Sequence, residues 1–320
     1  MNSWGNIFSL LASLSKSEKR HFKLLASLQE GEKKYLTLFD ELEKTAAQQE
    51  QPFEWNDAGE TLLKNRLIRK GISGQLHVLR NYLASMILKS LRLQEENRTA
   101  ADEARTKMRE SVIMQRKGLY QPAVEKCTDA LEMAEQYELF DIEVEALAHL
   151  CYLKSQQNLK NYREELERIC QKLEAAAAQL ETEARYRSLH YQIFALSRLQ
   201  ANPDAPEISR LLNALESDER LAARPEGAGF QARVYYHSAL ANIAYARRDK
   251  TAAKIHNRSI LHLWEQHPRQ IEEKPRNYII AIANYLNLCI SSGDWTDFEQ
   301  YLEKMKAVRP VFFDDKAEAF

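Results

Sequence analysis

The chain has 320 residues, enough for about two ordinary domains or one elongated array. Its 45 basic and 46 acidic residues nearly cancel, so the net charge of -1 gives no general attraction to nucleic acid or to membranes. Only 9 Gly and 8 Pro residues are present, and good helix formers dominate, so we predict an all-α protein. The uncharged runs are too short for a transmembrane helix, and no basic residue precedes the first apolar patch, so we expect no secretory signal.

The first 97 residues have the pattern of a small helical domain. Residues 15–18, Ser-Lys-Ser-Glu, form a capping box before an amphipathic stretch. Apolar residues recur at helical spacing over 35–42 and 76–90, and Gly71 ends the helix that we expect over about 58–70. The polar string Glu-Glu-Asn-Arg-Thr then breaks the pattern. We therefore predict a helical N-terminal domain over residues 1–97.

A basic segment, residues 61–93, lies within this domain and contains no acidic residue. The side chains that could contact a phosphate backbone are Lys64, Arg66, Arg69, Lys70 and Arg92. Helical spacing distributes the positive charges of this segment over opposite sides. A cationic solvated surface, or one that faces acidic residues of the same chain, is therefore favoured over nucleic-acid binding.

From residue 98 the sequence becomes periodic, with short breaks between amphipathic stretches. We expect joints between helices near 118–120, 159–162, 201–205, 248–250 and 293–295. The interval from Tyr120 to Tyr162 is 42 residues, and that from Lys250 to Trp295 is 45. A fixed period of helix pairs indicates an α-solenoid, in which each pair covers its apolar face by stacking on the next.

One joint resembles a known family. Gly118, Tyr120, Ala123, Ala130 and Leu131 are spaced as in the turn and second helix of a tetratricopeptide repeat. This resemblance covers about residues 100–310 and implies a right-handed superhelix of about five helix pairs over residues 98–320. The period is longer than the 34 residues usual for that repeat. The N-terminal part resembles uncharacterised bacterial helical-repeat proteins, a likeness that implies no activity.

The resemblance also places a candidate binding surface. Asn242 and Asn287 each lie six residues before a joint, and Asn284 lies one turn before Asn287. In tetratricopeptide arrays this face of the first helix lines a concave groove, where asparagine amides hold a peptide backbone. The predicted peptide contacts are Tyr235, Asn242, Tyr245, Asn284 and Asn287. Ser238 and Ala283 stand where a carboxylate clamp would need lysine. The alternative is that these amides bond to neighbouring helices or to water.

No residue pattern indicates catalysis, and we expect neither an enzyme nor a cofactor. His262 and Glu265 could share a metal ion on one helical face, but structural zinc usually takes four ligands including Cys, so no metal site is predicted. The four cysteines, Cys127, Cys151, Cys170 and Cys289, are far apart at apolar helical positions. This pattern suits buried thiols in a reducing cytoplasm.

The favoured function is thus a non-enzymatic cytoplasmic scaffold that binds a protein or peptide in the groove of the superhelix. The alternative is a nucleic-acid-binding regulator that uses residues 61–93. The last stretch, residues 308–320, begins a new helical pattern and includes the apolar Phe312 and Phe313. A solenoid needs a polar terminal cap. We therefore expect either a fragment of a longer array or a homo-oligomer that covers this end with another copy.

Overall fold

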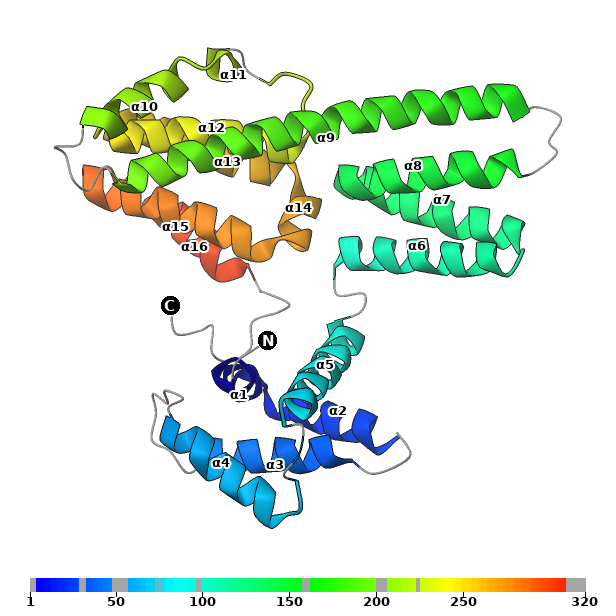
Figure 1. Ribbon diagram of the computed structural model, residues 1–320. Coiled ribbons are helices and arrows are strands. Elements are labelled where there is room, and N and C mark those ends of the chain that lie inside the picture. The colour runs from blue at the N-terminus through cyan, green and yellow to red at the C-terminus, as the bar shows by residue number, and fades with distance from the viewer. Residues whose placement is uncertain are drawn as a thin grey trace. The chain divides into compact units, whose positions relative to one another are not determined.

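The computed structural model describes residues 4–28, 33–47, 57–72, 74, 76–95, 99–156, 162–199, 206–222 and 225–308. All regular secondary structure in these residues is helical, which confirms the predicted all-α class (Figure 1). None of the described helices is long and apolar enough to cross a membrane. The chain divides into two compact units, Met1–Glu96 and Asn97–Phe320.

The first unit is a cluster of helices around one apolar core. Its helices are α1 (Trp4–Ser13), α2 (Lys16–Ser27), α3 (Lys34–Ala47), α4 (Asp57–Arg69) and α5 (Leu76–Glu95). The predicted capping box is confirmed: the Glu18 backbone N–H donates to Ser15 Oγ at 3.2 Å, and the Ser15 N–H donates to the Glu18 carboxylate at 2.6 Å. Phe22 of α2 stacks on Phe39 of α3 at 4.7 Å between ring centroids, in the middle of the core.

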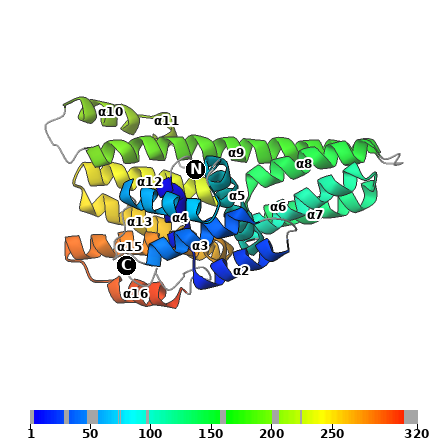
Figure 2. The ribbon, with the colours of Figure 1, turned by 60° about the horizontal axis from the view of Figure 1, so that its bottom comes forward.

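The second unit contains the periodic part of the sequence. Its described helices are α6 (Ala100–Arg116), α7 (Tyr120–Tyr137), α8 (Phe140–Ser155), α9 (Tyr162–Leu199), α10 (Pro206–Glu216), α11 (Glu219–Ala222), α12 (Phe230–Ala246), α13 (Lys250–Gln266), α14 (Pro268–Glu273), α15 (Pro275–Ser292) and α16 (Phe298–Ala307). Consecutive long helices pack against one another, and α9 lies beside both α8 and α12 (Figures 1 and 2).

Three of the predicted joints are confirmed. Helix α7 begins at Tyr120 after Gly118, α13 begins at Lys250, and α15 ends at Ser292 with Gly293 as its C-cap. Gly118 and Gly293 have φ of 75° and 69°, a left-handed conformation that glycine adopts without steric cost. The other two predicted joints, 159–162 and 201–205, fall largely or wholly outside the described residues. They lie at the two ends of α9.

The succession of helices departs from regular pairs in one prominent place. A helix-pair array needs a break between 162 and 201, but α9 is a single helix of 38 residues. No glycine or proline occurs between Tyr162 and Leu199, and the middle of this stretch is Ala-Ala-Ala-Ala. Nothing in the local sequence therefore interrupts helix propagation. The short helices α11 and α14 are further additions to the expected pattern.

The close-packing alanines of the repeat lie where the pattern predicts. Ala123, Ala130 and Ala253 are all fully buried. Ser111 of α6 donates its hydroxyl to the Ala123 carbonyl at 2.7 Å, so α6 and α7 approach closely at this point. A small side chain is needed where two helix backbones come together in this way, and a larger one would overpack the contact.

Two carboxylates join distant parts of the second unit by capping helices that begin far away in the sequence. The Glu273 carboxylate accepts hydrogen bonds from the backbone N–H groups of Ala100 and Ala101, at 2.7 and 3.2 Å, at the start of α6. The Glu138 carboxylate accepts from the Phe230 N–H at the start of α12, at 2.5 Å. A carboxylate at a helix N-terminus satisfies free N–H groups and interacts favourably with the helix dipole.

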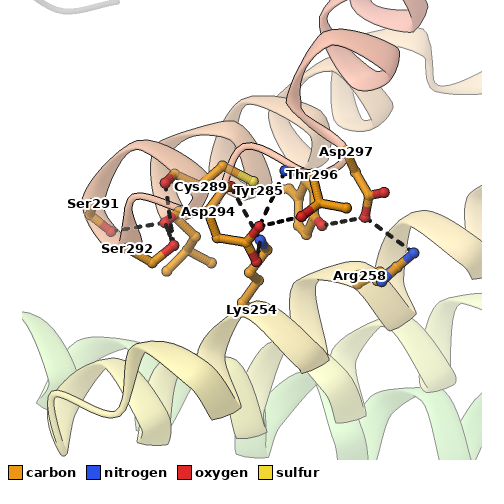
Figure 3. A network of polar contacts seen from close by, with 10 residues as sticks. Lys254, Arg258, Tyr285, Cys289, Ser291, Ser292, Asp294, Thr296 and Asp297 are labelled. Atoms are coloured by element: carbon orange, nitrogen blue, oxygen red, sulfur yellow. Dashed lines mark hydrogen bonds and ion pairs between the residues drawn. The ribbon is translucent and has the colours of Figure 1, made fainter.

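A polar network fixes the joint between α15 and α16 onto α13 (Figure 3). The Tyr285 hydroxyl donates to Asp297 Oδ2 at 3.0 Å, and Arg258 of α13 pairs with the same oxygen at 3.1 Å. Lys254 pairs with Asp294 and holds the pKa of that carboxyl well below its usual range. The whole joint is thereby tied to the neighbouring helix. The expectation of an uncovered C-terminal end concerns residues 309–320, which lie outside the described residues.

Candidate functional site

Four helices of the second unit, α9, α12, α13 and α15, border a cavity of about 350 Å³, which we call the groove. These helices pack in the order α9, α12, α13, α15. The groove lies along the part of α9 that follows residue 189, on the face of α12 that also carries Ser238, and along the first half of α15. It is thus built from segments more than 90 residues apart in the sequence.

The structure brings together four of the five residues predicted to contact a peptide. Tyr235, Asn242 and Tyr245 of α12 and Asn284 of α15 all line the groove. Asn287 is exposed on α15, one turn beyond Asn284, and is not one of the lining residues. The equivalence of Asn242 and Asn287 in the repeat therefore does not extend to the groove.

Aromatic rings form a large part of the wall. They are His190, Tyr191, Phe194, Tyr235, Tyr245 and Trp264. The His190 ring lies 5.4 Å from Tyr235 and 6.0 Å from Phe194, measured between ring centroids. Trp264 is 2% exposed and packs edge-on against Phe230 below the groove, so this part of the wall is anchored in the core.

Side-chain amides supply the polar groups of the groove. They are Gln231, Asn242, Asn257, Asn277 and Asn284. Each amide offers a donor and an acceptor. Asn257 is buried and already donates to the Ala253 carbonyl at 2.8 Å, so its amide is held in one position. Asn277 and Asn284 are exposed on the same helix, seven residues apart and therefore on one face.

Formal charge is absent from the lining of the groove. All of the lining residues are in the described part of the chain, and none of them is Asp, Glu, Lys or Arg, although 28% of the protein is charged. Burial raises the pKa of Tyr235 and of Tyr245, so both phenols stay protonated. Burial lowers the pKa of His190, which favours the neutral imidazole. The groove therefore presents hydrogen-bonding groups without charge.

Two arginines lie at the outer edge of the aromatic wall. The Arg187 guanidinium lies over the Tyr235 ring at 5.6 Å from its centroid, and Arg198 lies over Phe194 at 4.6 Å. Arg187 also pairs with Glu183 one turn earlier on α9. These cations stack on the aromatic rings without lining the groove, and such stacking holds the rings in place.

Sequence reasoning missed the contribution of α9. His190, Tyr191 and Phe194 lie shortly before the predicted joint at 201–205, just as Asn242 and Asn287 lie shortly before theirs. The same repeat logic, applied to this joint, points to these rings. The predicted contacts all lie on the two helices before the joints at 248–250 and 293–295, α12 and α15.

His190 makes the stability of the protein depend on pH. Its Nδ1 is buried and has no hydrogen-bond partner. An unfolded chain has a histidine pKa of about 6.5, and the folded pKa is lower, so the unfolded state binds the proton first as pH falls. The stability from neutral His190 is therefore present above about pH 6.5 and is lost as pH falls through the lower folded value.

We expect the urea midpoint of the second unit to be lower at pH 5.5 than at pH 7.5. The decrease should be smaller in His190→Phe, which keeps an aromatic ring at this position but cannot titrate. His149, whose pKa is also lowered by burial, contributes to the pH dependence that remains in both proteins. Equal falls in the two proteins would show that His190 is not held neutral by its surroundings.

The basic segment of the first unit is partly neutralised within that unit. Lys64 pairs with Glu60 at 2.7 Å, and Lys70 pairs with Glu41 at 2.7 Å. Glu41 is 4% exposed, and its hydrogen bond with Lys70 lowers the pKa of the carboxyl. These ion pairs agree with the interpretation of the basic residues as a surface that faces acids of the same chain.

The three arginines predicted for the nucleic-acid alternative have different surroundings. Arg66 donates to Thr45 Oγ1 at 3.4 Å and is partly buried. Arg69, at the end of α4, and Arg92, near the end of α5, are exposed. The predicted basic residues therefore include both packed and solvated side chains.

A larger cavity of about 820 Å³ lies between α12, α13 and α16. Arg258 and Lys304 border it, but Arg258 pairs with Asp297 and Lys304 pairs with Glu265 at 2.6 Å. Three of its five charged lining residues are thus ion-paired, whereas Arg233 has a buried Nε without a hydrogen-bond partner. Among the described residues, no group of three or more His, Cys, Asp or Glu side chains could hold a metal ion.

Comparison with known proteins finds no matching family model, no matching curated protein and no matching solved structure.

Proposed function

We propose that the second unit is a non-enzymatic binding module that holds an extended, uncharged segment of another protein in the groove. In this proposal, α9, α12, α13 and α15 form a short superhelical array, and the ligand binds in the groove that they border. The observation that carries the proposal is the lining itself: amides and aromatic rings are concentrated there, and formal charge is absent.

The amides suit a peptide backbone. A backbone segment presents N–H and C=O groups in alternation, and each side-chain amide can accept from one and donate to the other. Asn242 on α12 and Asn284 on α15 would contact the segment from two sides of the groove. Main-chain hydrogen bonds give affinity without requiring a particular sequence, so specificity would come from the side chains of the segment.

The aromatic wall sets the preference for those side chains. Tyr191 and Tyr245 are both exposed and offer apolar surface together with polar edges, so aliphatic and aromatic residues of the segment would be buried against them. A charged residue would lose its hydration and find no opposite charge among the lining residues. The groove therefore favours uncharged segments over acidic or basic ones.

The chemistry of the lining supports binding in preference to catalysis. His190 is the one imidazole among the lining residues, all of which are described, and no carboxylate lies beside it there to orient it as a base. The cavity of about 350 Å³ is at the small end of the range for ligand sites. It would take one or two side chains of a longer segment.

The experiment is selection of random-sequence peptides on the immobilised 320-residue chain, repeated with Ser238→Trp. Ser238 lines the groove, so a tryptophan there would fill it. Ser155→Trp is the matched control, because Ser155 is exposed at the end of α8, away from the groove. We expect the native chain and Ser155→Trp to enrich uncharged, aromatic-containing sequences and Ser238→Trp to lose at least about 90% of this binding, a tenfold effect or about 1.4 kcal/mol.

Circular dichroism would establish that both tryptophan variants keep their helix content. Two results would contradict the proposal. One is enrichment of highly charged sequences by the native chain. The other is undiminished binding of the selected peptides to Ser238→Trp.

A further inference from the structure

Two of the four cysteines lie side by side, although they are 19 residues apart in the sequence. Cys151 is near the end of α8 and Cys170 is in the third turn of α9. Their sulfur atoms are 3.9 Å apart. Since α8 and α9 pack against one another, the pair spans an interface between two helices (Figure 1).

The surroundings of the four thiols differ. Cys170 is exposed and Cys151 is partly buried, whereas Cys127 and Cys289 are buried completely. The prediction of buried thiols is therefore right for Cys127 and Cys289 and wrong for Cys170. Burial raises the pKa of Cys127 to about 12, which keeps that thiol protonated and unreactive.

Solvent reaches Cys170 from an open cavity of about 410 Å³ on the surface of α9. Leu166 of the preceding turn, Arg163 two turns before Cys170 and Glu174 of the following turn border this cavity together with Cys170. A small oxidant would thus meet Cys170 before it meets the sulfur of Cys151. The proximity of a second thiol then decides what happens to the oxidised sulfur.

We propose that Cys151 and Cys170 form an intramolecular disulfide bond when the protein meets a peroxide. In the first step the Cys170 thiolate attacks one peroxide oxygen, the O–O bond breaks, and a sulfenic acid and hydroxide form. In the second step the sulfur of Cys151 attacks the sulfenic sulfur, the S–O bond breaks, and water leaves with the thiol proton. In total, two thiols and one hydrogen peroxide give one disulfide and two waters.

The geometry favours this second step. A disulfide has a sulfur–sulfur distance of about 2.0 Å, so the two atoms need to approach by about 2 Å from the observed 3.9 Å. Rotation of each side chain about its Cα–Cβ bond moves the sulfur without moving the helix. The neighbouring thiol also protects Cys170 from further oxidation, because it consumes the sulfenic acid first.

The bond would join α8 to α9 across the connection between them. It would close a covalent ring from residue 151 to residue 170 and prevent the end of α8 from separating from α9. Such a ring restricts the unfolded chain, so the oxidised protein should unfold at a higher urea concentration than the reduced one. This inference does not depend on the proposed function of the groove.

The test is treatment of the full, folded chain with hydrogen peroxide, followed by a count of free thiols in denaturant. The reduced chain has four thiols. We expect the count to fall to two, with no change in the migration of the monomer under non-reducing denaturing electrophoresis. Trypsin leaves Cys127 and Cys151 in one peptide, because no Lys or Arg lies between them, so fragmentation of the linked peptide is needed to assign the bond.

Two single variants separate the steps. Cys151→Ser should accumulate a sulfenic acid at Cys170 that dimedone traps, whereas the native chain should give little adduct. Cys170→Ser should keep its three thiols at the same peroxide dose. A native chain that gives a dimedone adduct as large as that of Cys151→Ser would overturn the proposal, as would a bond found only between two chains. An oxidised chain with the same urea midpoint as the reduced chain would also contradict it.

Discussion

Replacing Tyr285 with alanine is expected to lower the free energy of unfolding of the second unit by about 3 to 5 kcal/mol, the range for removing a large buried aromatic ring. Tyr285 is completely buried in the middle of α15. Its ring packs edge-on against Tyr301 of α16 at 5.0 Å, and its hydroxyl donates to Asp297. The substitution would therefore leave a cavity and remove a hydrogen bond from the joint shown in Figure 3.

A second variant separates these two contributions. Tyr285→Phe keeps the ring and removes only the hydroxyl, and Asp297 keeps its ion pair with Arg258. We expect a loss of about 1 kcal/mol for this variant. Tyr152→Ala, which removes an exposed ring from α8, is the matched control and should change stability by less than about 0.5 kcal/mol. Urea unfolding followed by circular dichroism would measure all three.

Equal losses for Tyr285→Ala and Tyr285→Phe would mean that the hydroxyl and not the packed ring stabilises the joint. The chain contains two compact units, so its unfolding can have two transitions. Only the transition that belongs to the second unit should move. A shift of both would indicate that the two units do not unfold separately.

Local sequence was sufficient to predict three joints of the second unit. Gly118 and Gly293 mark two of them because their left-handed backbone conformation favours glycine. The burial of Ala130 and Ala253 also follows from local pattern, since small residues recur where helices of a repeat approach closely. These features depend on spacing over fewer than about 20 residues, a range over which helical periodicity is informative.

Contacts across the fold could not be predicted in the same way. Glu138 and Glu273 are unremarkable charged residues in the sequence, yet each caps a helix that begins 92 or more residues away. One carboxylate oxygen of Asp297 contacts both Tyr285 and Arg258. This contact also depends on packing, because Arg258 reaches the joint from the neighbouring helix α13. The choice of such partners depends on how the helices pack, which no local spacing records.

Some residues of the groove could be predicted from local pattern, and others could not because their place in it depends on helix packing. Repeat equivalence selected Asn242 and Asn287, and helical spacing added Asn284; Asn242 and Asn284 line the groove, but Asn287 does not. The error arises because the groove runs along only the first half of α15, and Asn287 lies one turn beyond Asn284, the last residue of that helix that lines it. The aromatic wall of α9 was missed because contacts were predicted only before the joints at 248–250 and 293–295, and not before the joint at 201–205.

The last prediction uses this difference between two neighbouring asparagines. Asn284→Asp should weaken binding of the selected uncharged peptides about 30-fold or more, which corresponds to about 2 kcal/mol. Asn287→Asp, with the same chemical change on the same helix, should leave affinity nearly unchanged. Both positions are exposed in the free protein, so neither carboxylate needs to be desolvated on folding, and the two variants should have similar stability.

The penalty for Asn284→Asp arises only when a peptide covers the groove. An aspartate can accept hydrogen bonds but cannot donate, so one contact to a backbone C=O is lost. Its charge would be buried among amides and aromatic rings with no cation in the lining to compensate for lost hydration. Titration calorimetry of both variants with one selected peptide would measure the difference. Equal weakening by the two variants would show that the peptide binds along the exposed face of α15 and not in the groove.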